Sequence, residues 1–363
     1  MNIVVHRGTH QIGGSAIEIS TASTHIMLDF GNELSLDEKY IPINLDIDGV
    51  TKGISDCDGI VISHYHMDHL GQLTAALPEI PLYMGVLSKE VAMISAEYQD
   101  KNLYLRLLGA NTFRGGEAFT IGDIRIRPLV IDHSAVDSYM FVIEAEGKRA
   151  LYTGDFRMHG LRHHVLDQLV NTYIGEVDVL ITEGTSLSRD ADKYISEAAV
   201  LDDISSYIQD GKYVFIMCSS TNIDRIMGIW HNMPTDKVLI CYAYQKRILD
   251  TVIDNVYYNS SLYRRPDSPL VLDIGAYPKY YMDNGFVSLV RGTENYISQI
   301  KKFIEKEHKV KVSLRLTGRE RLHADSAIKI LDEFASHFEE TAIVEKKYGK
   351  EQVQKFILLS PKK

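Results

Sequence analysis

The sequence predicts an α/β protein with two modules, a β-rich one followed by one in which strands and helices alternate. Three observations support this prediction. Short β-branched or alternating segments, separated by glycine-rich turns, fill the first half of the chain. After about residue 193, apolar strands alternate with amphipathic helices. The composition, 45% hydrophobic and 24% charged over 363 residues, is sufficient for one large domain or two ordinary ones.

Eight segments of the first half have the residue pattern of strands. Helical patterns stand between them at 68–77, where Asp68 suits the first turn of a helix, and at 88–99. Together these segments predict a mostly antiparallel, β-rich module with flanking helices that ends near residues 190–195. The expected strands are 3–6, 16–20, 25–30, 59–63, 124–131, 139–145, 150–153 and 178–182.

The rest of the chain has the strand and helix alternation that is typical of a parallel α/β sheet. We therefore divide the chain into a first domain at 1–193, an α/β domain at 194–310, and a C-terminal segment at 311–363 that could return to the first domain. The expected strands are 212–218, 237–241 and 355–360, and the expected helices are 195–210, 222–233, 245–256, 294–308 and 326–338.

The composition argues against several classes of protein. No apolar run approaches the roughly 18–20 residues that span a bilayer, and the first residues lack the pattern of a secretion signal, so we expect no membrane association. The cysteines Cys57, Cys218 and Cys241 stand far apart, which disfavours both a disulfide framework and a cysteine-based zinc site. These features favour a cytoplasmic protein.

The charge of the chain is unevenly distributed. The net charge is −10, yet residues 301–363 hold 15 Lys and Arg against 10 Asp and Glu. The first 300 residues therefore hold 24 Lys and Arg against 39 Asp and Glu. Such an acidic body disfavours indiscriminate binding of polyanions, because nucleic-acid affinity depends on Lys and Arg contacts to phosphates. A locally basic groove, or a metal that supplies the positive charge, remains compatible with this composition.

One short stretch combines several metal-ligand side chains. His64, His66, Asp68 and His69 follow an apolar strand directly and precede the first expected helix. In extended backbone His64 and His66 project from the same side, while Asp68 and His69 approach from the turn into the helix. Imidazole and carboxylate together suit zinc or a similar divalent ion. The alternative, a histidine-rich surface loop, is disfavoured by four such residues at one strand end.

This stretch resembles the HxHxDH motif of the metallo-β-lactamase fold, and later motifs follow in the same order. His133 ends a long apolar strand, and Asp155 in LYTGDFR ends another. By itself Asp155 would suit a turn equally well. Asp29 in MLDFG also resembles an early element of this family, with a structural or supporting role. The resemblance implies an αββα sandwich for the first domain.

The same resemblance implies roles for these residues. Two divalent ions, zinc or alternatively manganese, would share a water and activate it for attack on an electrophile. Asp68 would also accept a hydrogen bond from that water, which makes it a candidate catalytic residue. In this interpretation one ion is held by His64, His66 and His133, the other by Asp68 and His69, and Asp155 bridges them.

Further motifs are similar to the β-CASP branch, which includes ribonuclease J and the endonucleases of 3′-end processing. They are DHSAVDSYMF at 132–141, YTGDFRMHG at 152–160 and ITEGTSL at 181–187. Members of this branch insert an α/β domain after these strands, which agrees with the pattern from 194 onward. SSTNIDRIMGI at 219–229 resembles a segment that contacts RNA backbone. This resemblance implies Ser220, Asn222 and Arg225 as substrate-binding residues.

The chain departs from this branch near its end. The branch carries an HxSGH-like motif and then a last ligand histidine in a PxHG-type stretch, and neither is intact here. The best candidate is His323 in RLHAD at 321–325. A surface histidine at the start of a helix is an equally good interpretation of it. We therefore expect the second metal site to be weaker than the first.

These features predict a metal-dependent hydrolase, foremost a phosphodiesterase or ribonuclease of ribonuclease J type with RNA as its partner. One alternative is a hydrolase of a small ester, thioester or lactone on the same fold, since fold does not determine substrate. Another is a catalytically weakened scaffold that binds RNA or a protein partner. A homodimer is compatible with the sequence.

Overall fold

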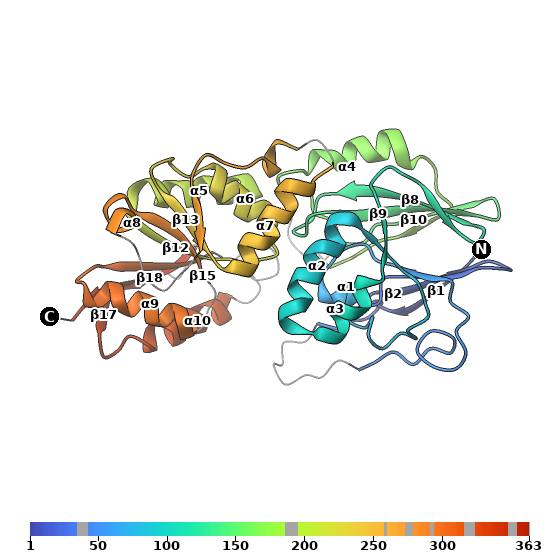
Figure 1. The fold of residues 1–363 in the computed structure, drawn as a ribbon, viewed down its shortest axis with the longest axis horizontal. Coiled ribbons are helices and arrows are strands. Elements are labelled where there is room, and N and C mark those ends of the chain that lie inside the picture. Colours follow the sequence, from blue (N-terminus) through green and yellow to red (C-terminus); the bar gives the residue numbers. More distant parts are fainter. Residues whose placement is uncertain are drawn as a thin grey trace. The chain divides into compact units, whose positions relative to one another are not determined.

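The computed structural model describes residues 1–34, 43–185, 195–257, 260–272, 279–290, 294–315, 324–347 and 354–362. Two compact units can be distinguished (Figure 1). The first comprises Met1–Arg189, Thr221–Arg225 and Arg247–Arg264, and the second comprises the remainder. The sequence ranges 1–193, 194–310 and 311–363 remain a prediction about domains, because compactness alone does not define a folding unit.

A six-stranded mixed sheet forms one layer of the first unit. Its first three strands pair antiparallel and the following pairs are parallel. The parallel pairs differ from the mostly antiparallel arrangement expected here. Helices or long turns connect these strands, and such crossover connections return the chain to the edge of the sheet at which the previous strand began. In order across the sheet the strands are β1 (Asn2–Arg7), β2 (Ala16–Ser20), β3 (His25–Leu28), β4 (Gly59–Val61), β5 (Leu82–Gly85) and β6 (Asn111–Phe113).

A five-stranded sheet forms the second layer. It is antiparallel except for the pair of β10 and β11. In order across the sheet the strands are β11 (Val179–Ile181), β10 (Lys148–Tyr152), β9 (Ser138–Ala145), β8 (Ile124–Ile131) and β7 (Phe119–Ile121).

Apolar side chains from facing strands make the core between the two sheets. Ile19 and Leu28 of the six-stranded sheet belong to one buried cluster with Ile126, Phe141 and Tyr152 of the five-stranded sheet. This is the expected result of period-2 alternation, which directs every second side chain of a strand to one face. The burial of these apolar side chains is the main force that holds the two layers together.

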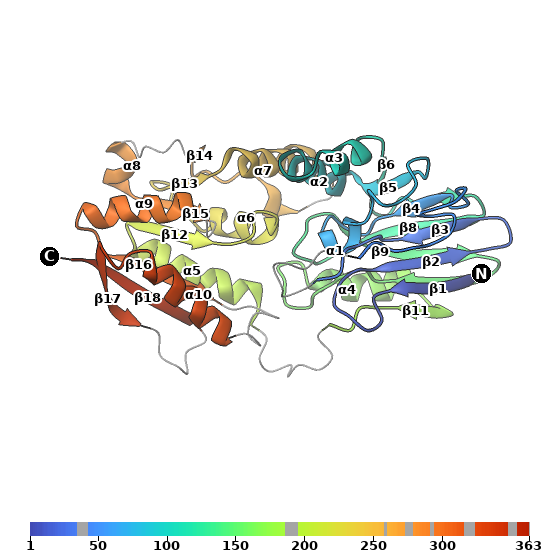
Figure 2. The same ribbon diagram turned by 90° about the horizontal axis from the view of Figure 1, so that it is seen from below.

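Helices cover the outer faces of both sheets. α4 (His164–Leu169) and the following π-helical turn Val170–Ile174 pack through Leu169 and Ile174 against the outer side of the five-stranded sheet (Figure 1). α2 (Val86–Gln99) and α3 (Lys101–Leu108) lie beside β5 and β6 (Figure 2). The predicted αββα sandwich is therefore confirmed.

The first predicted helix is much shorter than expected. α1 (Met67–Leu70) ends where 68–77 was expected to continue. A Cβ on Gly71 would lie 2.3 Å from Nδ2 of Asn32, and Gln72 donates from its backbone to Phe30 O at 2.9 Å and from its side chain to Asn32 Oδ1 at 2.6 Å. These bonds to the segment after β3 take the place of helical ones.

A four-stranded, wholly parallel sheet forms one part of the second unit, as the sequence predicted. Helices connect its strands, which is the usual route between parallel neighbours. In order across the sheet the strands are β12 (Tyr213–Met217), β15 (Phe286–Val290), β13 (Val238–Cys241) and β14 (Leu270–Leu272). The helices along this stretch are α5 (Glu197–Asp210), α6 (Ile223–His231), α7 (Ala243–Asn255) and α8 (Lys279–Asn284).

The C-terminal stretch adds a small antiparallel sheet with two helices. β16 (Val310–Arg315), β18 (Gln354–Pro361) and β17 (Ala342–Lys347) lie in that order, accompanied by α9 (Glu294–Glu305) and α10 (Ala324–Ser336). Their apolar side chains share one cluster with those of β13 and β15. The sequence left open a return of 311–363 to the first domain, whereas the described residues of this range lie in the second unit.

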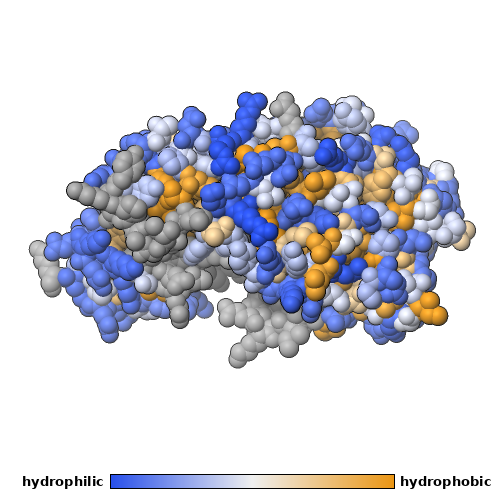
Figure 3. Space-filling view, in the orientation of Figure 1, coloured by the Kyte–Doolittle hydropathy of each residue, from blue (hydrophilic) through white to orange (hydrophobic). Residues whose placement is uncertain are grey.

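The surface is mixed in character. On the face drawn in Figure 3, apolar residues of the described chain form several separate areas between polar ones, which is ordinary for a folded protein. Within the described residues, the helices are too short or too polar to cross a membrane.

Candidate metal centre

Three segments of the first unit deliver the predicted ligands to one place. His64 and His66 occupy the turn between β4 and α1, Asp68 and His69 lie in α1, and His133 and Asp155 follow β8 and β10. Each segment thus leaves the end of a strand, and the two sheets present these ends on the same side of the sandwich. The rigid strands therefore fix where each ligand segment begins.

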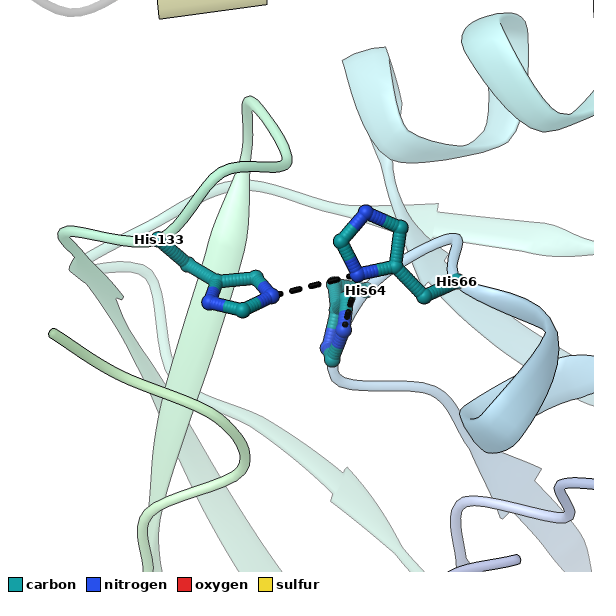
Figure 4. A group of neighbouring side chains, drawn as sticks. All are labelled: His64, His66 and His133. Atoms are coloured by element: carbon teal, nitrogen blue, oxygen red, sulfur yellow. Dashed lines mark hydrogen bonds between the residues drawn. The ribbon is translucent and has the colours of Figure 1, made fainter. Parts of the chain in front are cut away.

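Three imidazoles form the first group. Nδ1 of His66 lies 3.1 Å from Nε2 of His64 and 3.1 Å from Nε2 of His133. Figure 4 shows the three rings close together, with His133 on a loop opposite the segment of His64 and His66. Ligands bound to one zinc at its usual bond lengths lie about 3.3 Å from each other in a tetrahedral site. The spacing of these nitrogens therefore suits a single ion.

A second group shares His64 with the first and adds His69 and Asp155. Nε2 of His69 lies 3.3 Å from Oδ1 of Asp155, while Oδ2 of Asp155 lies 4.0 Å from Nε2 of His133. The two oxygens of Asp155 thus face different groups, as a bridging carboxylate would. Among the described residues Asp68 lies at the margin, with Oδ2 3.8 Å from Nε2 of His69. The assignment of ligands to individual ions remains a prediction.

Asp29 holds His69 and Ser63 in place through hydrogen bonds to its carboxylate. It is completely buried and adopts a left-handed backbone angle, φ 56°, which is uncommon for a residue other than glycine. Its carboxylate accepts bonds from Ser63 N at 2.6 Å, Ser63 Oγ at 2.7 Å and Tyr152 OH at 2.6 Å, and it contacts His69 Nδ1 at 2.7 Å. A carboxylate on Nδ1 leaves Nε2 of His69 available for a metal. The supporting role expected for Asp29 agrees with these contacts.

Burial and charge set the protonation of these groups. Burial, reinforced by the neighbouring imidazoles, holds the pKa of His64 and of His133 well below the ordinary value. Burial alone would lower the pKa of His69 too, but the Asp29 and Asp155 carboxylates raise it well above the ordinary value. Burial alone would raise the pKa of Asp155, but His69 and the other imidazoles lower it. Neutral imidazoles beside an ionised carboxylate are a donor set that fits a divalent cation.

Two further carboxylates hold the segments that carry candidate ligands: Asp132, which the sequence analysis did not single out, and Glu183, which the sequence equally suits as a positioning residue or a strand-end cap. Asp132, the residue before His133, is completely buried and accepts bonds from Arg157 Nε and from Arg162 N, both at 2.8 Å. Glu183 Oε1 accepts from Phe156 N at 3.0 Å and so holds the segment after Asp155. The consecutive Asp-His pair at a strand end was the available signal for Asp132.

The three predicted substrate-binding residues differ in their burial and in the unit to which they belong. Ser220 is buried, at 2% exposure, while Asn222 and Arg225 are half-buried. Asn222 and Arg225 belong to the first unit and Ser220 to the second. Their contact with RNA remains a prediction. His323 lies outside the described residues.

Comparison with known families identifies the first part of the chain. A sequence model described as a Beta-lactamase superfamily domain matches residues 46–204, which include all six candidate ligands. This chain contains a β-lactamase superfamily domain. The recognition of this fold from the HxHxDH motif is thereby confirmed.

Curated relatives of the β-lactamase superfamily domain are ribonucleases by name. An RNase J-like protein of Methanocaldococcus jannaschii is 27% identical over 58% of this chain and 49% of its own length. Endoribonuclease YSH1 of Gibberella zeae is 28% identical over 58% of this chain and 27% of its own length. Ribonuclease J of Helicobacter pylori is 25% identical over 60% of this chain and 33% of its own length. The chain therefore spans less than half the length of these relatives.

The C-terminal stretch is similar to a different family. A model of the C-terminal domain of translation initiation factor IF-3 matches residues 293–362. Translation initiation factor IF-3 of Fusobacterium nucleatum is 54% identical over 70 residues, 19% of this chain and 36% of that protein. The sequence analysis missed this similarity and recorded only the change to net positive charge after residue 300. His323, considered there as a displaced ligand, falls within this stretch.

A solved structure shares the arrangement of the elements. The crystal structure of a protein of unknown function from Enterococcus faecalis V583 matches with a TM-score of 0.62 and 17% identity, covering 84% of this chain and 85% of that one. At this identity the likeness concerns the fold alone.

Proposed function

We propose that this protein is a metal-dependent phosphodiesterase that cleaves RNA in the manner of ribonuclease J. The observation that carries the proposal is the pair of ligand groups that share His64 and present one oxygen of Asp155 to each side. Ribonuclease relatives over 58–60% of the chain support RNA as the substrate. Zinc suits the histidine-rich donor set best, with manganese as the alternative.

The residues of the centre can serve different roles in hydrolysis. Two divalent ions, when bound, supply Lewis acidity and an activated water. Asp68 stands at the margin of the centre, where its carboxylate can accept a proton from that water. Asp29 keeps His69 oriented through Nδ1, and Asp155 provides the negative charge shared between the two groups. A β-CASP-like role for the segment that holds Ser220, Asn222 and Arg225 would add these three residues as contacts to the RNA backbone.

The two metal sites are expected to differ in strength. The group of His64, His66 and His133 offers three imidazoles, whereas the other relies on His69, Asp155 and the more distant Asp68. Zinc titration followed by calorimetry should therefore show two unequal steps, because a site with fewer ligands binds more weakly. Two equally tight steps would require a further ligand from outside the described residues.

Cleavage of a fluorescent RNA with added Zn²⁺ or Mn²⁺ tests the activity. The variant His64→Ala/His66→Ala should lose both its bound metal and at least about 100-fold of its rate, since removal of ligands abolishes the water activation on which metal-dependent hydrolysis depends. His337→Ala is the matched control, because His337 is an exposed histidine of the second unit.

The same experiment distinguishes the alternatives. Hydrolysis of a panel of small esters, thioesters and lactones without RNA cleavage would favour the second hydrolase hypothesis. Metal binding without either activity would favour a scaffold. A homodimer and a cytoplasmic location remain predictions.

A second candidate function concerns the C-terminal stretch. Residues 293–362 are 54% identical over 70 residues to a translation initiation factor, which favours a role in translation initiation for this part of the chain. The test is a reconstituted bacterial translation reaction that lacks IF-3, supplemented with the full chain. Restored initiation would support this role, and an unchanged yield would exclude it under these conditions.

A further inference from the structure

We propose that the segment Thr221–Arg225 is a positioning element of the metal centre, which ties together the three segments that carry the ligands. This inference rests on the proposed function in one respect, that the centre holds metal. The segment belongs to the first unit, although its neighbours in sequence on both sides belong to the second. Two side chains, Tyr65 and Asp224, make the connections.

The first connection runs through Tyr65, which stands between the ligands His64 and His66. Its ring is 6% exposed, and its hydroxyl donates to Thr221 O at 2.9 Å and accepts from Val136 N at 3.0 Å. Val136 lies three residues after His133. One hydroxyl thus joins the His64–His66 segment, the His133 segment and Thr221.

The second connection runs through Asp224, which is completely buried. Its carboxylate accepts from Arg157 Nη2 at 3.2 Å, from Arg162 Nε at 3.3 Å and from Tyr263 OH at 2.5 Å. Arg157 lies two residues after Asp155, and its Nε donates to Asp132 beside His133 at 2.8 Å. A continuous chain of charged hydrogen bonds therefore leads from Asp224 to both the Asp155 and the His133 segments.

These contacts are suited to holding ligands rather than to binding substrate. The side chain of Arg157 is 9% exposed and that of Arg162 is 10% exposed, so both guanidinium groups are directed inward onto carboxylates. Two buried carboxylates, Asp132 and Asp224, balance the two guanidinium groups, which is the condition under which charges tolerate burial. Charge-assisted bonds of this kind fix geometry strongly. Residues that orient metal ligands through hydrogen bonds commonly contribute 10- to 100-fold to metal affinity.

Two variants and two controls test this inference in the full-length protein. Tyr65→Phe and Asp224→Asn each remove one connection. Tyr139→Phe and Asp137→Asn are the matched controls, because both residues are completely buried in the same unit and bond to each other at 2.6 Å, while Asp137 also accepts from the start of α2. None of their hydrogen-bond partners belongs to Thr221–Arg225.

Zinc affinity is measured by competition with a chromophoric chelator, and the absorption spectrum of the cobalt-loaded protein reports ligand geometry. We expect about 10- to 100-fold weaker zinc binding and an altered cobalt spectrum for Tyr65→Phe and Asp224→Asn, with both controls unchanged once folded. Circular dichroism establishes folding, and Tyr65→Phe decides the matter if Asp224→Asn fails to fold.

The outcomes separate this inference from the proposed function. If the wild-type protein binds zinc and both folded variants bind it as tightly as the controls do, the inference is wrong and the proposed function is unaffected. Equal weakening in variants and controls would show a general loss of stability and would also overturn it. If the wild-type protein binds no divalent metal, both proposals fail.

Discussion

At the scale of single residues, the Asp29 carboxylate brings together three residues of the centre. Its two oxygens accept hydrogen bonds from the backbone nitrogen and the hydroxyl of Ser63 and from the hydroxyl of Tyr152. One of them also contacts Nδ1 of His69. Such convergence of donors needs a carboxylate, because an amide offers only one accepting oxygen. The orientation of His69 therefore depends on a residue 40 positions earlier in the chain.

Asp29→Asn should weaken both metal binding and stability. The new amide hydrogens would face existing donors, which leaves buried polar groups without partners and costs about 1–3 kcal/mol of unfolding free energy. The bound zinc should fall toward one equivalent, because His69 belongs to the second group only. Elemental analysis and urea unfolding measure the two effects. Asp46→Asn, on a carboxylate that is 74% exposed and pairs with Lys52, should change neither.

The candidate ligands could be proposed from the sequence because they are local. His64 to His69 form one motif, and His133 and Asp155 stand at the ends of apolar strands that the pattern located correctly. The supporting residues could not be found in this way. Tyr65, Asp132 and Asp224 derive their roles from partners that are between 25 and 156 positions away, and no periodicity records such pairs.

At the scale of elements, α1 depends on a close approach of the chain after β3. A Cβ placed on Gly31 would lie 1.7 Å from the carbonyl oxygen of Asp68 and 2.6 Å from the nitrogen of His69. Phe30 N also donates to His69 O at 2.7 Å. Only glycine allows this approach, so Gly31 sets the position of the helix that carries two of the candidate ligands.

Gly31→Ala should displace α1 and destabilise the first unit. The methyl group would push against backbone atoms that cannot rotate away, and overpacking of this kind costs about 1–3 kcal/mol or more. Thermal unfolding measures the loss, and zinc titration measures the displacement of the ligands. Gly109→Ala is the matched control, because a Cβ there meets nothing within 4 Å and its φ of −81° is ordinary for any residue. A wild-type melting temperature in Gly31→Ala would contradict this role.

Most elements of the fold could be predicted from apolar periodicity, and the exceptions have physical reasons. The helices α2, α5, α6, α7, α9 and α10 lie where their amphipathic patterns indicated. The helix expected at 68–77 stops early because bonds to Phe30 and Asn32 replace helical ones. The sequence analysis also did not expect several short elements, among them the strands β5, β6, β7 and β14, which have only three or four residues each. It further missed the longer strands β15, β16 and β17 and the helices α3, α4 and α8.

At the scale of the whole molecule, the six candidate ligands that the structure describes lie in the first unit, while the second unit has a core of its own. Metal binding should therefore stabilise one unit selectively. A ligand at 100 times its dissociation constant stabilises the state that binds it by about 2.7 kcal/mol.

Chelation should lower the melting temperature of the first unit by about 5–10 °C and leave the second transition in place. Differential scanning calorimetry with and without a chelator, followed by restoration with excess zinc, measures the shift. The His64→Ala/His66→Ala variant is the control, because a chelator should no longer change its first transition. A shift of both transitions together would mean that the two units unfold as one.

The two-part organisation was visible in the sequence because the rhythm of strands and helices changes near residue 193. The origin of the last 70 residues was not visible in the same way. The amphipathic patterns at 294–308 and 326–338 predicted the helices α9 and α10, but such periodicity is shared by unrelated families. Only a comparison with known sequences could separate this stretch from the α/β part before it.

The aromatic ring of Phe303 lies where the stretch similar to the IF-3 C-terminal domain packs against the parallel sheet. Its centroid lies 5.2 Å from that of Tyr213 and 5.6 Å from those of Phe215 and Phe286, which belong to the parallel sheet. The apolar faces on the two sides of this contact keep each other from water, and exposed apolar area promotes aggregation. Cutting the gene at residue 292 would thus leave Val238, Ile240 and Phe286 facing water, and the severed product would be prone to precipitate.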